Sequence, residues 1–375
     1  MSSYQYYEFQ AIDRLLTEDE QHEVAALSSR VKPHPRQATF IYHWSDFPAD
    51  PRAILLQYYD AFFYESSWGS RQLMFRFPQS AVDLESALPY CQPLIVEDYF
   101  SFSTAGAYTL LNVEFHEEGG SPWLEEPGSV SAMISLRDDL VRGDYRALYL
   151  AWLKVLEVDD LLPSVREPPV PPGLQSLTPA LHIFADFLGI DEALIQVAAQ
   201  ASGEPQAPPA DWLRAAVDQL PSDERDTFLL RLAQGEPHLT AVLNRRLREI
   251  APRPSEASLL RRTVDDLLQA AEAQRERERK RRAAEAEARR ISQMEALAQR
   301  EAEVWAEVET LIERMQAKPY DQAVELLVKL HDLAHYQNQE AGFQQRIDDL
   351  YERYPRRSGL LRRLREAGLV QQGIR

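Results

Sequence analysis

The chain has 375 residues, of which 45% are hydrophobic and 27% are charged. This composition is typical of a globular protein with a substantial core, and it excludes collagen-like, disulfide-scaffold and wholly disordered classes. At about 150 residues per domain, the length predicts two or three domains. Lys and Arg number 41 and Asp and Glu number 59, a net charge of −18 that argues against broad, non-specific binding of nucleic acid.

Several common chemistries lack their sequence signatures. Cys91 is the only cysteine, which excludes an intramolecular disulfide, a CxxC redox pair and a cysteine-based zinc ribbon. The N-terminus does not have the pattern of a secretory signal, and no window approaches 18 consecutive apolar residues. We therefore expect a cytoplasmic protein without a membrane span. The sequence also contains no P-loop, dinucleotide-binding or nucleophile-elbow motif.

Charge is distributed unevenly along the chain. Residues 1–160 carry 11 basic and 25 acidic side chains, residues 161–250 carry 7 and 12, and residues 251–375 carry 23 and 22. The acidity therefore belongs to the front of the chain, which also holds most of the aromatic residues. This partition predicts an acidic N-terminal domain and a densely charged but balanced C-terminal part.

The first 160 residues alternate strand-like and helix-like patterns. Strands are predicted at 4–12, 39–44 and 71–77, with a hairpin pair at 93–102 and 108–115. Thr17 and Glu20 have capping-box spacing, so a helix should follow to about residue 28. Helical spacing of apolar residues predicts a second helix from Pro51 through Phe62, and two more at about 129–141 and 144–157. Interleaved strands and helices predict an α+β domain over residues 1–162.

The rest of the chain is predicted to be mostly α-helical. Five prolines predict a semi-extended linker at 163–174, because proline lacks the backbone donor and fixes φ. Apolar residues at helical spacing predict a small all-α domain at 175–250. Glu and Arg then alternate at three- and four-residue spacing, with no apolar residue larger than alanine over 274–290. They predict a long charged helix over 255–317, followed by a helical hairpin over 318–375.

Two histidines form the sharpest local motif. His331 and His335 in the sequence HDLAH lie one helical turn apart, a spacing at which two imidazoles can share a metal ion. Asp332 occupies the position at which the HExxH motif has a glutamate as general base. The side chain of aspartate is shorter by one methylene and would not reach the metal-bound water that the glutamate activates. A catalytic zinc would need a third ligand, for which Asp348 or Asp349 is available. The alternative is a hairpin helix whose buried stripe the two histidines flank.

A basic run is the candidate contact for nucleic acid. It consists of Arg275, Arg277, Arg279, Lys280, Arg281 and Arg282. Such a run can contact phosphates, and the alternative is a solvated helix with internal ion pairs.

An aromatic cluster, Tyr58 to Trp68, is interpreted as core packing and, alternatively, as a stacking platform for a ligand.

Several motifs resemble a family of uncharacterised bacterial proteins. These motifs are YQYYEFQAIDR at 4–14, the segment from Trp68 to Pro78 and PPVPPGL at 168–174, so the resemblance covers most of the chain. Members of that family are encoded beside SWIM zinc-finger proteins, and KPYDQAVELLVKL at 318–330 is similar to helical tails in that neighbouring group. The resemblance implies a SWIM zinc-finger protein as partner, but no activity and no site residues. The chain itself lacks the CxC and CxH ligands of a SWIM finger.

The sequence therefore predicts a non-enzymatic interaction or adaptor protein of a bacterial cytoplasmic complex. The long helix would be its spacer or docking element, although residues 274–290 lack the apolar seam of a coiled coil. No cofactor and no metal are expected. The first alternative is a nucleic-acid-associated factor acting through the Arg-rich helix or a SWIM-type partner, and the second is a metal-dependent enzyme using His331 and His335. The oligomeric state is left open.

Overall fold

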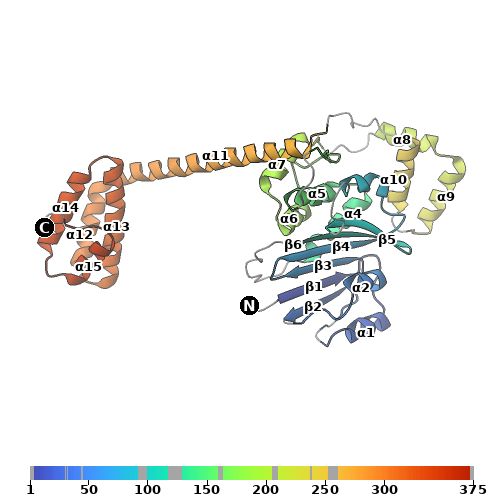
Figure 1. Cartoon of the computed structure of the whole chain (residues 1–375), viewed down its shortest axis with the longest axis horizontal. Coiled ribbons are helices and arrows are strands. Elements are labelled where there is room, and N and C mark those ends of the chain that lie inside the picture. Colours follow the sequence, from blue (N-terminus) through green and yellow to red (C-terminus); the bar gives the residue numbers. More distant parts are fainter. Residues whose placement is uncertain are drawn as a thin grey trace. The chain divides into compact units, whose positions relative to one another are not determined.

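The computed structural model describes residues 4–29, 31, 33–43, 45–91, 99–116, 129–158, 164–204, 210–236, 239–251 and 261–371. The chain forms two compact units, residues 1–275 and 276–375. The first unit contains an antiparallel sheet with helices, and the described part of the second is helical (Figure 1). The predicted fold class is thus confirmed. Among the described helices, none is long and apolar enough to cross a bilayer.

A six-stranded antiparallel sheet forms the centre of the first unit. Its strands are β1 (Tyr4–Gln10), β2 (Gln37–His43), β3 (Ala61–Ser66), β4 (Ser70–Pro78), β5 (Phe100–Ala105) and β6 (Tyr108–His116). They lie in the order β2-β1-β3-β4-β6-β5. The register places Tyr7 opposite Tyr64 and Phe9 opposite Phe62, so these aromatic side chains share one face of the sheet.

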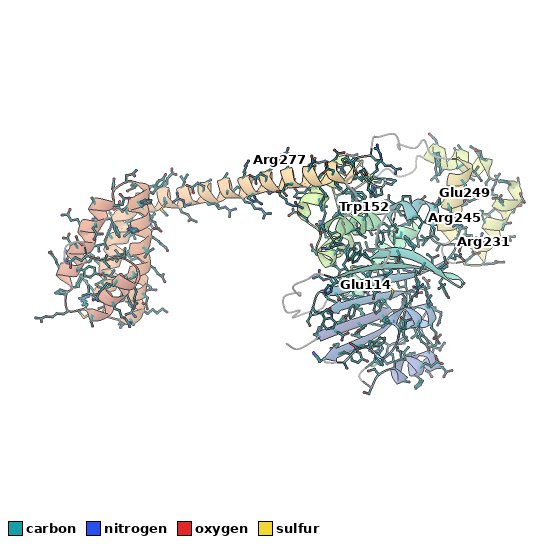
Figure 2. All side chains as sticks on the ribbon, in the orientation of Figure 1. Glu114, Trp152, Arg231, Arg245, Glu249 and Arg277 are labelled. Atoms are coloured by element: carbon teal, nitrogen blue, oxygen red, sulfur yellow. The ribbon has the colours of Figure 1, made fainter. Side chains whose placement is uncertain are left out.

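Helices cover both faces of this sheet (Figure 1). On one face, α1 (Glu18–Ala26) and α2 (Pro51–Tyr58) pack over apolar side chains that include Phe9 and Phe62. The predicted capping box is present: the Glu20 N–H donates to Thr17 Oγ1 (3.3 Å) and the Thr17 N–H donates to the Glu20 carboxylate (2.8 Å). On the other face lie α3 (Leu84–Ala87), α4 (Ile134–Val141) and α5 (Arg146–Val158), with the short 3₁₀ turns η1 (Leu88–Tyr90) after α3 and η2 (Val130–Ala132) before α4. Trp152 of α5 is fully buried there (Figure 2).

The aromatic segment is half helix and half strand, which corrects the prediction of one helix through Phe62. Helix α2 begins after Asp50, whose carboxylate accepts a hydrogen bond from the Arg52 N–H (2.9 Å), and it ends at Tyr58. Strand β3 then begins at Ala61. Phe62 and Phe63 are both fully buried although they point to opposite faces, so apolar periodicity cannot distinguish strand from helix here. Core packing of this cluster is confirmed at Tyr58, Tyr59, Phe62 and Phe63, whereas Trp68 is partly exposed.

The described part of the predicted linker, residues 164–174, is instead built into the first unit. Glu167 is 2% exposed and accepts hydrogen bonds from the Arg262 guanidinium (2.6 and 2.8 Å) and from the Tyr149 hydroxyl. Burial holds the pKa of Tyr149 well above its usual value, so its hydroxyl stays protonated as a donor. The Val264 N–H donates to the Val165 carbonyl (2.8 Å). The segment is therefore clamped by residues about a hundred positions later in the chain.

Residues 175–250 divide between two cores, which differs from the prediction of one small domain. Helices α6 (Pro179–Leu188) and α7 (Glu192–Ala201) pack into the core of the sheet, because residues such as Phe184 and Leu194 are too apolar to remain at the surface. Helices α8 (Ala210–Gln219), α9 (Ser222–Ala233) and α10 (Leu239–Ile250) form a separate small core.

Two helices replace the single charged helix predicted over 255–317. Helix α11 (Val264–Gln299) begins in the first unit, where Val264 and Leu267 are buried, and α12 (Glu301–Glu313) follows after Arg300. The φ of −115° and ψ of 14° at Arg300 interrupt the helix without a glycine or proline. In the second unit, α12 packs with α13 (Ala317–Tyr336), α14 (Glu340–Arg353) and α15 (Ser358–Glu366) around one apolar core. Helices α13 and α14 correspond to the predicted hairpin.

Candidate functional site

A hollow in the first unit lies over β4, β6 and β5, on the sheet face that carries Met74 and Leu110 and beside the start of α2. It has a volume of about 490 Å³. Strand alternation builds it: odd-numbered residues of β4 and β6, such as Leu73 and Val113, enter the core, and even-numbered ones face the hollow. Its polar wall comprises Asp50, Arg52, Ser70, Gln72, Ser101, Ser103, Asn112, Glu114 and His116.

The polar wall is organised by hydrogen bonds between strands. Gln72 Nε2 donates to Asn112 Oδ1 (2.8 Å) and to Glu114 Oε2 (2.9 Å). Figure 2 shows Glu114 on its strand, β6. Arg52 Nη2 donates to Ser103 Oγ (2.9 Å) at another part of the wall. These groups can hydrogen-bond a polar ligand, but their geometry does not assemble a nucleophile, a base and an oxyanion site in one place.

A serine and a histidine meet at the edge of this hollow. Ser70 Oγ lies 3.0 Å from His116 Nδ1 and accepts a hydrogen bond from Trp68 Nε1 (3.1 Å). The Ser66 hydroxyl also accepts a hydrogen bond from the Ser70 N–H (3.0 Å), which fixes the turn between β3 and β4. Ser70 is thus held by three neighbours at the start of β4, which supports a structural role.

Asp13 and Arg76, from two of the motifs that carry the family resemblance, belong to a largely buried ionic network with Asp60 and Arg137. Asp60 Oδ2 accepts the backbone N–H groups of Ile12 (2.7 Å) and Asp13 (2.9 Å), and Asp60 Oδ1 pairs with the Arg76 guanidinium (2.6 and 3.1 Å). Arg137 pairs with both carboxylate oxygens of Asp13 (2.6 and 2.9 Å) and donates to the Arg76 carbonyl (2.9 Å). Asp60, Arg76 and Arg137 are all buried. Asp13 and Arg76 therefore help to hold the sheet to α4, whereas Ser70 and Gln72 of the same motifs face the hollow.

The two histidines of HDLAH lie on the surface of the second unit. His335 Nδ1 lies 2.7 Å from Glu340 Oε1, and the His331 ring packs edge-on against Phe343 with 5.3 Å between centroids. The hydrogen bond with His335 lowers the pKa of the Glu340 carboxyl. Within the described ranges, no group of three or more His, Cys, Asp or Glu side chains is arranged to hold a metal ion. His331 and His335 thus lack a third ligand there.

The basic run of α11 is exposed but carries its own counter-charges. Glu276 pairs with Arg279 (3.1 Å) and Lys280 (3.3 Å), and Glu278 pairs with Arg281 (2.8 Å) and Arg282 (3.9 Å). Arg275 pairs with Asp191 and Glu272. Among the described residues, only Arg277 of this run has no carboxylate within 4.0 Å, and it is exposed (Figure 2). The run therefore matches the solvated-helix alternative in its geometry.

Helix α9 has a surface that sequence periodicity did not reveal. Leu229, Leu230 and Leu232 are 60%, 63% and 64% exposed. Both Leu229 and Leu232 fit the helical spacing of this segment, but only Phe228 of these neighbours packs against the core of α8 and α10. A signal was present: leucines at three positions out of four cannot all share one narrow helix face. We call these three residues the α9 leucine surface.

Cys91 is a partly buried free thiol in the first unit. Desolvation raises its pKa to about 12, so the reactive thiolate is scarce at neutral pH. This argues against a nucleophilic role.

Comparison of the chain with protein-family models, with curated proteins and with solved structures gives no match.

Proposed function

We propose that the chain is a non-enzymatic interaction protein that binds a helix of a protein partner on the α9 leucine surface. The observation that supports this proposal is the exposure of Leu229, Leu230 and Leu232, each above half of its maximum. Burying one such side chain completely is worth about 1.5–3 kcal/mol. Contiguous exposed leucines on a single helix favour association with another protein.

The inner side of α9 is already occupied. Glu224 accepts two hydrogen bonds from the Arg246 guanidinium (2.8 and 2.9 Å), and Phe228 packs against the core of α8 and α10. By helix geometry Leu229 and Leu230 face away from this side, whereas Leu232, four residues after Phe228, borders it. Helix α9 itself lies at the periphery of the first unit (Figure 1). Leu229 and Leu232 are three residues apart and form a row along the helix. Such a row fits the apolar stripe of a second amphipathic helix.

The middle of α11 supports the role of a connecting arm in the same proposal. Residues 277–290 contain only Glu, Arg, Lys and Ala. Their ion pairs at three- and four-residue spacing stabilise a solvent-exposed helix. An arm of this kind joins two folded parts without needing a partner along its length.

Affinity capture with surface variants tests the proposal. The full-length chain and its Leu229→Asp/Leu232→Asp variant would be used to retain proteins from a lysate of the source bacterium, with mass spectrometry as readout. A SWIM zinc-finger protein is the first partner to test. Binding would then be measured by calorimetry with the purified partner. We expect at least a tenfold loss of affinity, because two buried leucines contribute more than the 1.4 kcal/mol that a factor of ten requires.

Two exposed apolar residues outside α9 provide the matched control. Leu15 and Val370 are each 50% exposed, so Leu15→Asp/Val370→Asp makes the same chemical change elsewhere. It should bind like the unaltered chain. Equal retention by the α9 variant would contradict the proposal. Light scattering could instead show that the unaltered chain is a dimer and that the α9 variant is a monomer. That result would identify a second copy of the chain, rather than a different protein, as what binds the α9 leucine surface.

A further inference from the structure

A second cluster of arginines lies at the end of the chain, in the second unit. It consists of Arg353, Arg356, Arg357, Arg362, Arg363 and Arg365, and no acidic residue occurs between its first and last members. We call it the C-terminal arginine patch. The whole second unit is close to neutral, with 19 Lys and Arg against 18 Asp and Glu. The patch is therefore a local concentration of positive charge and not a reflection of a basic domain.

Packing of α15 fixes the outward direction of the patch. Leu360 and Leu364 are fully buried in the core of the second unit, four residues apart on one helix face. Arg362 and Arg365 are exposed and lie three residues apart on the outer side. The apolar side of α15 is consequently buried within the unit, and its solvent-facing side carries the guanidinium groups of Arg362 and Arg365 together with Glu366.

Half of the patch has no carboxylate partner among the described residues. Arg353 pairs with Glu309 (3.1 Å), Arg362 lies 3.7 Å from Glu366, and Arg363 pairs with Asp321. By contrast, no described carboxylate lies within 4.0 Å of Arg356, Arg357 or Arg365. Arg357 instead donates to the Ile312 carbonyl and stacks over the Tyr354 ring at 4.3 Å.

This arrangement differs from that of the basic run in α11. There, each of the four cations from Arg279 to Arg282 has a glutamate one turn away on the same helix. An incoming phosphate would compete with those glutamates and would be repelled by them. In the C-terminal patch, Arg356 and Arg365 can accept an external anion without displacing an internal one.

We propose that the C-terminal arginine patch binds the phosphodiester backbone of nucleic acid. Guanidinium groups bind phosphate oxygens in a bidentate manner, and backbone contacts need several such groups in series and no apolar anchor. The stretch from Arg353 to Arg365 exposes no large apolar side chain. A membrane-surface helix would need an exposed apolar face, and the centre of a protein interface would need an apolar or aromatic anchor. Backbone binding is the use that this surface fits.

Fluorescence anisotropy with matched variants tests this proposal on the full-length chain. The probes are a labelled 25-base-pair DNA duplex and a single-stranded RNA of the same length, each titrated between about 25 and 200 mM NaCl. The patch variant is Arg356→Gln/Arg362→Gln/Arg365→Gln. The control, Arg279→Gln/Arg281→Gln/Arg282→Gln, removes the same charge from α11. All six side chains are exposed, and far-UV circular dichroism checks that both variants stay folded.

The expected result is binding that weakens at least tenfold in the patch variant and less than twofold in the control. The slope of log K against log salt concentration should decrease by about 2 to 3 in the patch variant, because each lost phosphate contact removes about 0.9. Equal weakening in both variants would overturn the assignment to this patch. Absence of binding at the lowest salt would overturn it too, as would retention of the chain only by vesicles containing phosphatidylglycerol or only by an acidic protein.

Discussion

At the scale of single residues, buried charges matter more than exposed ones in this protein. Asp60, at 0% exposure, receives two backbone N–H groups and one guanidinium, so its charge is satisfied without water. Arg76 and Arg137 extend the same network toward α4. Breaking such a network leaves an uncompensated charge in a medium that solvates it poorly, whereas breaking an exposed pair returns both groups to water.

Replacing Asp60 by Asn should destabilise the first unit strongly. The amide cannot neutralise the Arg76 guanidinium, and loss of one partner from a buried pair costs about 3–5 kcal/mol. Urea unfolding followed by circular dichroism would show the expected fall in midpoint. The control is Glu20→Gln, which breaks the exposed Arg14–Glu20 pair (2.7 Å) and keeps a side chain able to cap α1; it should cost at most about 1 kcal/mol. Similar losses in both variants would show that burial does not set the cost.

At the scale of elements, local signals identified the strands and helices, and long-range packing decided where they end. The capping box of α1 and the alternation in β4 depend on residues within a few positions, so both could be predicted. The boundary between α2 and β3 could not, because an apolar run fits either pattern when both faces are buried. The break at Arg300 carries no glycine or proline. The clamp between Glu167 and Arg262 joins residues 95 apart, which no periodicity reveals.

This clamp determines where the first unit can be cut. A fragment of residues 1–275 retains Arg262, Val264 and Leu267, whereas a fragment of residues 1–254 loses all three and exposes the Glu167 carboxylate without its guanidinium. We expect the shorter fragment to lose near-UV circular dichroism and cooperative melting that the longer one keeps. A shorter fragment that melts as cooperatively as the longer one would show that residues 261–275 are dispensable to this core.

At the scale of the whole molecule, the chain has two compact units with separate apolar cores. The candidate sites follow this division, with the α9 leucine surface in the first unit and the C-terminal arginine patch in the second. Sequence patterns singled out His331, His335 and the run from Arg275 to Arg282, because a motif and a charge run are visible in one dimension. They did not single out the two surfaces, because exposure of a leucine and absence of a counter-ion depend on the folded neighbours.

Separate cores predict separate unfolding. Leu327 is fully buried in the second unit, and Leu327→Ala should remove about 2–5 kcal/mol of stability from that unit. Differential scanning calorimetry should resolve two transitions, of which the variant lowers one and leaves the other within about a degree. A single transition that shifts as a whole would show that the two units unfold cooperatively.

The isolated thiol of Cys91 makes the chain suited to site-directed spectroscopy. Because its pKa lies near 12 and it is partly buried, maleimide and methanethiosulfonate reagents at neutral pH will favour a cysteine introduced at an exposed position. A spin label or fluorophore on α9 and another on α15 can then be attached without first replacing the native cysteine. Distances between the two labels would report directly on how the leucine surface and the arginine patch move when each finds its ligand.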